Sequence, residues 1–190
     1  ISNDFVVSVP WLIEAQNIVY SADGWIRKMP GASNVNTTAT GATDNVMGIF
    51  DYWRSTASGD PVQRRVVYAG TQIYSNTPGN ATLDSIATGR VADVMPAFEV
   101  MNDALIMAET STTDVPATWD QTTFANLGGS PPNFSFHVQH KDRMWAAGVD
   151  SNKSRLYYSV SGSAADWAGA GSGSIDIAPD DGAQITGHAP

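Results

Sequence analysis

Potential metal ligands are few in this chain, and their spacing does not suit a metal site. There is no cysteine, which excludes disulfide bonds and thiolate ligands. The three histidines are His137, His140 and His188. Residues three apart on a β-strand point to opposite faces, so His137 and His140 are not expected to share a metal ion. The sequence also lacks a His-Glu-x-x-His pattern. We therefore expect surface or turn histidines.

A loop late in the sequence carries three aspartates before a glycine. Asp176, Asp180 and Asp181 precede Gly182, and carboxylates in such a loop can bind Ca²⁺. Their spacing differs from that of the twelve-residue helix-loop-helix site, and no Glu ends the loop. Asp before Gly is also a common turn former. The sequence therefore predicts no metal site, and no cofactor is expected.

Carboxylate pairs are a third possibility, since glycosidases use two acids about 5–9.5 Å apart. Asp103 and Asp142 are 39 residues apart in equivalent turns, which indicates a structural repeat rather than two different catalytic roles. The other acids are Asp51, Glu99 and Glu109. The arginines that a sialidase-like site would need are scattered along the chain, and no nucleophile elbow or phosphate loop is present. We therefore expect that the protein is not an enzyme.

Aromatic side chains could bind sugars by stacking if they were exposed. Trp119 and Trp145 lie in predicted strands and are expected in the core. Trp53 and Trp167 are expected to be exposed, Trp167 in a loop rich in Ser, Gly and Ala. A carbohydrate-binding module therefore stays open as an alternative function.

The charge balance argues against tight binding of nucleic acid. The chain of 190 residues has 19 acidic and 10 basic residues and a net charge of −9. Proteins that grip DNA neutralise its phosphates with Lys and Arg, and this sequence has no basic run. An acidic wall would instead repel DNA over about one Debye length, ~10 Å at 0.1 M salt. No apolar stretch approaches the ~18 residues of a membrane span, so none is expected.

The elements that position these residues are predicted to be β-strands, because short apolar runs alternate with turn residues. Three such runs, at 66–69, 105–108 and 144–147, recur at intervals of 39 residues. Each is followed by a short strand that contains an aromatic residue. A period near 40 residues with several strands per period is typical of β-propeller blades, and a β-sandwich is the alternative. The predicted blade core consists of Val67, Ile106, Trp145, Tyr74, Trp119 and Tyr157.

The repeat divides most of the chain into three predicted blades, 46–89, 90–129 and 130–187, the last with an inserted loop at 161–174. A closed propeller needs at least four blades. The predicted ring is therefore incomplete in this chain, and we expect residues 188–190 to begin a part that is missing.

Residues 1–45 do not share the repeat and are predicted to form an extended arm, a hairpin and a linker. The arm contains Pro10, which favours extended backbone before it. The hairpin covers residues 17–31, with a two-residue turn at Asp23-Gly24. This segment either docks a neighbouring protein or seals the propeller edge, and the sequence favours neither. The predicted docking residues are Trp11, Trp25, Arg27, Lys28 and, in the third blade, Trp167.

Taken together, these segments resemble the tail hub, or nozzle, proteins of short-tailed bacteriophages. Those proteins are built on a β-propeller. The resemblance extends over about residues 8–187 and is carried by turn and strand motifs. The motifs lie at 27–31, 48–51, 69–74, 127–132, 140–148, 154–159 and 181–187.

The resemblance implies a structural subunit of a phage tail. Such proteins form a six-fold ring below the portal and adaptor, and they line the channel through which DNA exits. The implied partners are other copies of the chain, portal and adaptor proteins, and tail fibres or the tail tip. The implied location is the virion tail, assembled in the bacterial host cytoplasm. The alternative is a carbohydrate-binding propeller at a tail or fibre tip.

Overall fold

The computed structural model describes residues 18–20, 26–28, 45–56, 59–110, 113–177, 179 and 183–187. The chain divides into two compact units, Ile1–Asn34 and Val35–Pro190. The described residues form β-strands and no helix. The predicted all-β class is therefore confirmed.

The first unit contains a β-hairpin. Strand β1 (Ile18–Tyr20) pairs antiparallel with β2 (Ile26–Lys28), and Tyr20 is opposite Ile26. An odd number of residues therefore lies between Tyr20 and Ile26. Strands joined by a two-residue turn pair residues that have an even number of residues between them. The predicted two-residue turn at Asp23-Gly24 is therefore wrong in register. The turn residues and the predicted extended arm lie outside the described residues.

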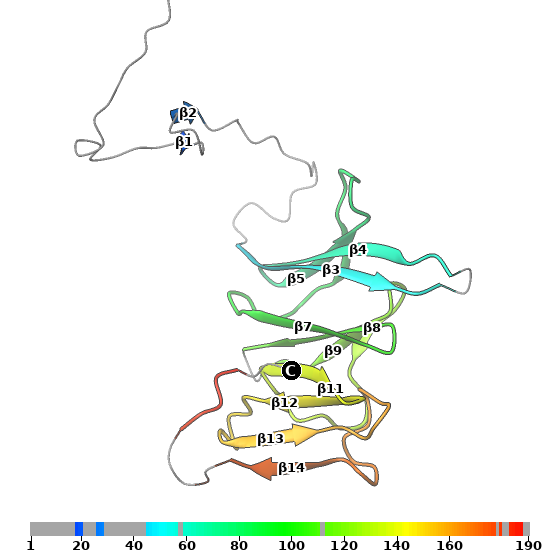
Figure 1. Cartoon of the computed structure of the whole chain (residues 1–190), viewed down its shortest axis with the longest axis vertical. Helices are drawn as coiled ribbons and strands as arrows, with labels where there is room; N and C mark the ends of the chain where they lie inside the picture. Colours follow the sequence, from blue (N-terminus) through cyan, green and yellow to red (C-terminus); the bar gives the residue numbers. More distant parts are fainter. Residues whose placement is uncertain are drawn as a thin grey trace, which may run out of the picture. The chain divides into compact units, whose positions relative to one another are not determined.

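The second unit contains three four-stranded antiparallel sheets, each with its strands in chain order (Figure 1). The first sheet consists of β3 (Val46–Arg54), β4 (Val62–Ala69), β5 (Gln72–Asn76) and β6 (Asp84–Ala87). The second consists of β7 (Pro96–Met101), β8 (Ala104–Glu109), β9 (Ala117–Trp119) and β10 (Phe124–Asn126). The third consists of β11 (Phe136–His140), β12 (Arg143–Ala147), β13 (Arg155–Tyr158) and β14 (Gly173–Asp176). Each sheet lies within one of the three predicted segments.

Two tight turns open the second and third sheets in the same way. Asn102-Asp103 joins β7 to β8, and Lys141-Asp142 joins β11 to β12. All four turn residues have positive φ, between 48° and 62°. This backbone is that of the type I′ turn, whose twist matches the twist of paired strands. The repeated acidic turns of the sequence therefore set the register of two hairpins.

The sheets stack on one another through their first strands. Strand β7 contacts both β3 and β11, and these contacts place the three sheets in chain order (Figure 1). Phe50 of β3 stacks on Phe98 of β7, with ring centroids 5.3 Å apart. Close approach of these strands also needs Gly48, since a Cβ there would lie 2.4 Å from Cγ of Pro96.

Two hydrophobic clusters fill the spaces between the sheets. The cluster between the first and second sheets includes Val66, Tyr68, Leu105, Met107 and Trp119. The cluster between the second and third includes Ile106, Ala108, Phe134, Met144 and Ala146. Neighbouring residues of β8 thus face opposite sheets, as the two-residue period of a strand requires.

The 39-residue repeat is in phase for two sheets only. Leu105 faces the preceding sheet, and so does Met144. Val66, which the repeat aligns with them, faces the following sheet instead. Because side chains alternate along a strand, the first copy is displaced by an odd number of residues relative to the others. The exact repeat predicted for the first blade is therefore wrong.

Four of the six predicted core residues, Val67, Ile106, Tyr74 and Trp119, are buried. The other two, Trp145 and Tyr157, are half-buried. Tyr157 packs at the edge of the cluster between the second and third sheets. Trp145 lies on the opposite face of the third sheet, where its ring contacts Tyr158. That face meets no fourth sheet among the described residues, so Trp145 keeps part of its surface in solvent.

Candidate functional site

A groove runs between the outer strands of the first and second sheets. Its volume is about 290 Å³, and an adjoining depression shares three of its lining residues, Arg64, Gln121 and Thr122. Trp119 and Phe124 form the aromatic part of its lining. Trp119 is only 3% exposed, so its ring offers little surface for stacking. The remaining lining residues are Ser75, Asp84, Ser85 and Ile86.

The polar groups of the groove are partly held by the protein. The Arg64 guanidinium donates to Oγ1 of Thr77 at 2.5 Å. The Gln121 amide donates to the carbonyl of Val62 at 2.9 Å, which ties the β9–β10 turn to the first sheet. Asp84 is exposed beside them. A guanidinium, a carboxylate, an amide and hydroxyls are groups that hydrogen-bond to polar ligands such as sugars.

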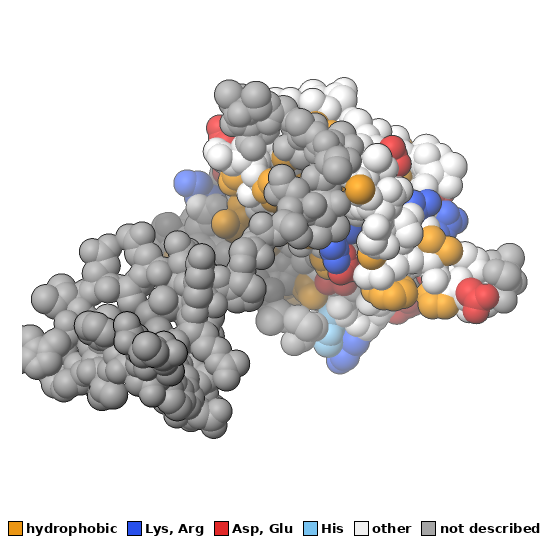
Figure 2. Space-filling view, turned by 90° about the horizontal axis from the view of Figure 1, so that it is seen from above, with side chains coloured by type: hydrophobic (Ala, Val, Ile, Leu, Met, Phe, Trp, Pro, Cys, Tyr) orange, Lys and Arg blue, Asp and Glu red, His pale blue; other side chains and the backbone are white. Residues whose placement is uncertain are grey.

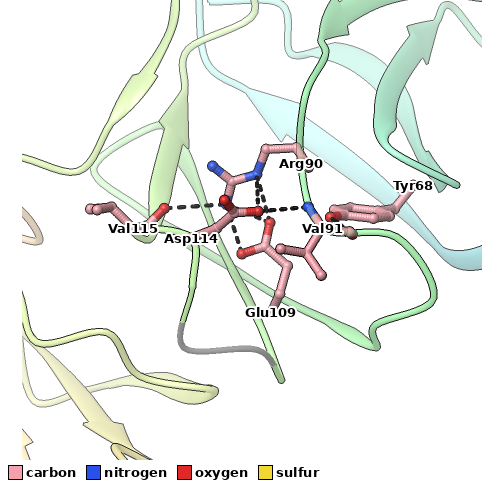
Figure 3. Close-up of polar contacts among 6 residues, drawn as sticks. All are labelled: Tyr68, Arg90, Val91, Glu109, Asp114 and Val115. Atoms are coloured by element: carbon pink, nitrogen blue, oxygen red, sulfur yellow. Dashed lines mark hydrogen bonds and ion pairs between the residues drawn. The ribbon is translucent and has the colours of Figure 1, made fainter.

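A buried ion network joins the first two sheets at Arg90, which follows β6 (Figure 3). Nε of Arg90 lies 2.9 Å from Oε1 of Glu109, and Nη2 lies 2.7 Å from Oε2. Arg90 is 8% exposed and Glu109 1%. Asp114 lies 3.5 Å from Nε of Arg90 and accepts the backbone N–H of Val91 at 2.7 Å. The network therefore fixes the crossover from the first sheet to the second.

Burial controls the protonation of this region. It raises the pKa of the Glu109 carboxyl, against the opposing hydrogen bonds and charge of Arg90. It works to lower the pKa of Arg90, but the hydrogen bonds and charge of Glu109 outweigh it and raise that pKa. Burial also raises the pKa of Tyr68, whose hydroxyl donates to the carbonyl of Val91 at 2.9 Å. Arg90 therefore stays charged and Tyr68 stays neutral, as a structural network requires.

The turn residues Asn102 and Asp103 connect three sheets. Tyr52 of the first sheet donates its hydroxyl hydrogen to the carbonyl of Asp103. Oδ1 of Asp103 accepts the backbone N–H of Ser55 at 3.3 Å. Asn102 donates to the carbonyl of Gly162, in the loop of the third sheet, at 2.8 Å. Asp103 thus has a place in the packing of the sheets.

The other candidate acids also have local partners. Asp51 forms a bidentate pair with Arg65, with distances of 2.8 and 3.1 Å. Glu99 accepts the backbone N–H of Val100 at 3.1 Å, and Asp142 accepts the hydroxyl of Ser161 at 3.2 Å. These contacts give each carboxylate a role in local structure.

Trp167 is packed against the protein and is half-buried, so the predicted exposure of its ring is wrong. Its ring lies 5.4 Å from that of Phe134 at the cluster between the second and third sheets. Its indole N–H donates to the carbonyl of Ala164 at 2.8 Å. Its backbone N–H donates to the carbonyl of Gly129 at 3.2 Å. The loop folds back over the sheets because its small residues allow close contact.

The other four predicted docking residues belong to the first unit. Trp11 and Trp25 lie outside the described residues. Arg27 and Lys28 belong to β2, opposite Val19 and Ile18, and only their backbone is described. Trp53 is 52% exposed, as predicted.

No group of three potential metal ligands occurs among the described residues. His137 and His140 lie on opposite faces of β11, as predicted. His140 is exposed, whereas His137 is buried with Nε2 3.1 Å from the carbonyl of Ile106, so the prediction of a surface or turn histidine is wrong for His137. Asp176 pairs with Arg155, with distances of 2.5 and 3.0 Å. Asp180 and Asp181 lie outside the described residues.

Sequence reasoning missed the groove and the Arg90 network. Arg90, in the crossover after β6, and Glu109, at the end of β8, are 19 residues apart, and no local pattern relates them. The groove combines Arg64 and Asp84 with Trp119 of another sheet. Only the stacking of sheets brings such residues together.

The part of the chain that the structure describes contains no helix able to cross a membrane. No protein family, curated protein or solved structure matches the chain.

Proposed function

We propose that this chain is a structural subunit of a bacteriophage tail and contributes part of a β-propeller to the nozzle ring below the portal and adaptor. One observation carries the propeller: three consecutive four-stranded antiparallel sheets stack in chain order through their first strands. A propeller blade is such a sheet, and neighbouring blades bury its faces. The tail itself rests on the resemblance of the sequence motifs.

The packing between sheets supports a rigid element rather than a catalytic one. The two hydrophobic clusters, the buried pair of Arg90 with Glu109 and the bridging turn at Asn102-Asp103 all connect one sheet to the next. The candidate acids Asp51, Glu99, Asp103, Glu109 and Asp142 take part in such local contacts. We propose that the protein acts by assembly and not as an enzyme.

The charge supports a channel that DNA passes without tight binding. With a net charge of −9, the subunit would repel phosphate groups at short range. We propose that its partners are further copies in a six-fold ring, the portal and adaptor proteins, and tail fibres or the tail tip. Its location would be the virion tail, after assembly in the bacterial host cytoplasm.

Electron microscopy of the native assembly that contains the chain tests this proposal. The expected result is a six-fold ring on the axis of a phage tail, with density for the stacked sheets in its wall. A monomer, or a subunit at the distal tip of a fibre, would overturn the nozzle function. An antibody that binds the first sheet on the side of the exposed Trp53 would identify the chain in the ring.

The groove between the first two sheets favours a second candidate function, binding of a host carbohydrate. Arg64 and Asp84 supply charged groups there, and Trp119 at its base would report on a bound sugar by fluorescence. We expect Arg64→Ala to abolish a fluorescence change caused by host polysaccharide. Arg65→Ala is the matched control, because Arg65 points to the opposite face of β4 and pairs with Asp51. No response of the unmodified chain to any host polysaccharide would exclude this function.

A further inference from the structure

Two arginines line the depression that continues the groove between the first and second sheets. Its volume is about 450 Å³, and Arg54 and Arg64 are the charged residues among the described residues that line it. The other lining residues are Ser55, Thr56, Val62, Gln121 and Thr122. The chain as a whole has 19 acidic and 10 basic residues, and both signs of charge occur on the face that Figure 2 shows. Positive charge concentrated in one concave site of so acidic a chain favours an anionic ligand.

The first sheet presents both guanidinium groups on the face that meets the second sheet. Arg64 of β4 lies two residues before Val66, which packs in the cluster between these sheets, and side chains two apart on a strand share a face. Arg54 of β3 is opposite Val62 of β4, and cross-strand partners also share a face. From the second sheet, the amide of Gln121 donates to the carbonyl of Val62 at 2.9 Å. The two arginines therefore lie on one wall of the depression, and Gln121 closes it from the other side.

The guanidinium of Arg64 is oriented before any ligand binds. Its Nη1 donates to Oγ1 of Thr77 at 2.5 Å. In the part of the chain that the structure describes, Nε and Nη2 of Arg64 have no acceptor. A carboxylate pairs with a guanidinium through two parallel N–H groups, and Nε with Nη2 form such a pair. Since Thr77 holds the remaining nitrogen, less freedom is lost when a carboxylate binds.

The acids near the two arginines leave the Arg64 side of the depression basic. Nη1 of Arg54 donates to the carbonyl of Asp120, whose carboxylate lies 3.9 Å away. Oδ1 of Asp120 accepts the backbone N–H of Thr122 at 2.9 Å and of Thr123 at 2.7 Å, so this carboxylate belongs to its own turn. Asp84 lines the groove and not the depression. The site therefore has a basic end, and an end where a carboxylate can accept hydroxyl groups.

We propose that this groove selects a saccharide chain that carries a carboxylate, as uronic and sialic acids do. The carboxylate pairs with Nε and Nη2 of Arg64, and the charge of Arg54 adds to the attraction. Hydroxyl groups of the adjoining sugar donate to Asp84 at the other end. Thr77 is a positioning residue, which acts through Arg64. The inference rests on the second candidate function, binding of a host carbohydrate, and adds that the site prefers an acidic sugar to a neutral one.

Calorimetry with matched oligosaccharides tests the preference. The probes are tetramers of galacturonic acid and of sialic acid, each compared with its carboxyl-reduced form, in which a CH₂OH group replaces the carboxylate. An acidic tetramer is expected to bind the unmodified chain about tenfold or more tightly than its reduced form, because the reduced form cannot pair with the guanidinium. Added salt is expected to weaken binding of the acidic form only. The tetramer that binds more tightly identifies the source of the carboxylate.

Variants of the first sheet locate the contact. Arg64→Gln is expected to remove the preference, so that acidic and reduced tetramers bind equally. Arg65→Gln is the matched control, because Arg65 lies on the opposite face of β4 and pairs with Asp51, and it is expected to keep the preference. Thr77→Val leaves the charge of Arg64 but removes its hydrogen bond, so it should reduce the preference, and Thr77→Ser should restore it. Circular dichroism of each variant separates lost binding from lost folding.

Three outcomes would overturn the inference alone. Equal binding of acidic and reduced tetramers to the unmodified chain would show carbohydrate binding without selection of a carboxylate. A preference that survives Arg64→Gln in a folded variant would place the carboxylate elsewhere. A response to host polysaccharide without binding of either acidic tetramer would show that the groove takes another sugar. Absence of binding to all tetramers and to host polysaccharide would overturn the carbohydrate function together with this inference. Microscopy of the tail tests the nozzle ring independently of all these results.

Discussion

Val66 of β4 and Leu105 of β8 lie in one hydrophobic cluster between the first and second sheets, and both are 0% exposed. The sequence repeat aligns them as equivalent residues of two blades. In the structure they belong to opposite faces of their sheets, and these faces meet. Burial of an aliphatic side chain of this size contributes about 1.5–3 kcal/mol, so the contact is a main link between the two sheets.

Leu105→Ala is expected to lower the free energy of unfolding by about 2–5 kcal/mol, because truncation leaves a cavity between two sheets. Urea unfolding followed by tryptophan fluorescence measures this loss. The control is Ile175→Ala, at a side chain that is 48% exposed, where we expect a change within about 0.5 kcal/mol. Similar losses for the two variants would contradict the buried position of Leu105.

Arg90→Met is expected to destabilise the fold by about 3–5 kcal/mol, because it leaves the carboxylate of Glu109 buried without its partner. The double variant Arg90→Met with Glu109→Leu is expected to lose less than the sum of the single changes. Arg155→Met breaks an exposed pair of similar geometry, and a much smaller loss is expected there. Denaturant unfolding of the unmodified chain, Arg90→Met, Glu109→Leu and the double variant gives the coupling energy between Arg90 and Glu109. Additive losses would show that this pair is not coupled.

Gly129→Ala is expected to displace the loop that carries Trp167, since a Cβ at this position would lie 2.0 Å from the carbonyl oxygen of Ala165. Gly79→Ala is the matched control: its φ is also positive, but a Cβ there meets nothing within 4 Å. The left-handed backbone alone is expected to cost about 1–2 kcal/mol in each variant. Only Gly129→Ala should lose more stability than this, and only this variant should show faster proteolysis between residues 161 and 174. Equal loss of stability and equal proteolysis in the two variants would contradict the close contact between Gly129 and the loop.

Acid is expected to destabilise the fold. Arg65 lowers the pKa of Asp51, the backbone N–H of Thr123 lowers that of Asp120, and Arg155 lowers that of Asp176. Since the folded-state pKa values lie below those of the unfolded chain, the unfolded chain binds protons first as the pH falls. The stabilisation is present above about pH 4 and is lost below it. Thermal unfolding against pH measures this decline, and Asp120→Asn should reduce its slope. An unchanged slope would contradict the stabilisation of the Asp120 carboxylate.

Alkali is expected to destabilise the fold for a different reason. Burial raises the pKa of Tyr52 to about 12, so the unfolded chain loses this proton first as the pH rises. Stability is expected to be full below about pH 10 and to fall above it. Tyrosinate absorbance together with circular dichroism follows the transition. Tyr52→Phe should reduce the alkaline decline only in part, because burial also raises the pKa of Tyr68, and the double variant with Tyr68→Phe should reduce it further. An unchanged decline in Tyr52→Phe would contradict the assignment to Tyr52.

Local sequence predicted much of the fold. The apolar runs at 66–69, 105–108 and 144–147 all belong to the second strand of a sheet. The acidic turns at Asp103 and Asp142 form the expected pair of equivalent hairpins. These features depend on a two-residue period and on turn chemistry, which a few neighbouring residues determine.

The candidate site was not predictable in this way. Trp167 was expected in solvent because its neighbours are small and polar, yet the loop packs it near Phe134. Arg90 gave no signal, because its partner Glu109 lies 19 residues later, at the end of β8. Which side of the sheet Val66 faces depends on a shift of the first repeat by an odd number of residues. Such a shift moves the side chain to the other face of the sheet but leaves the hydrophobic pattern of the strand unchanged.

The sequence by itself determined that this protein is all-β, where its second strands lie and that it repeats at about 40 residues. Only the tertiary structure decided which face of each sheet meets the next and which residues line the groove. The reason is physical. Strands and turns follow from the conformations of adjacent residues, whereas contacts between sheets depend on side chains far apart in the chain, such as Val66 and Leu105, that meet only after stacking.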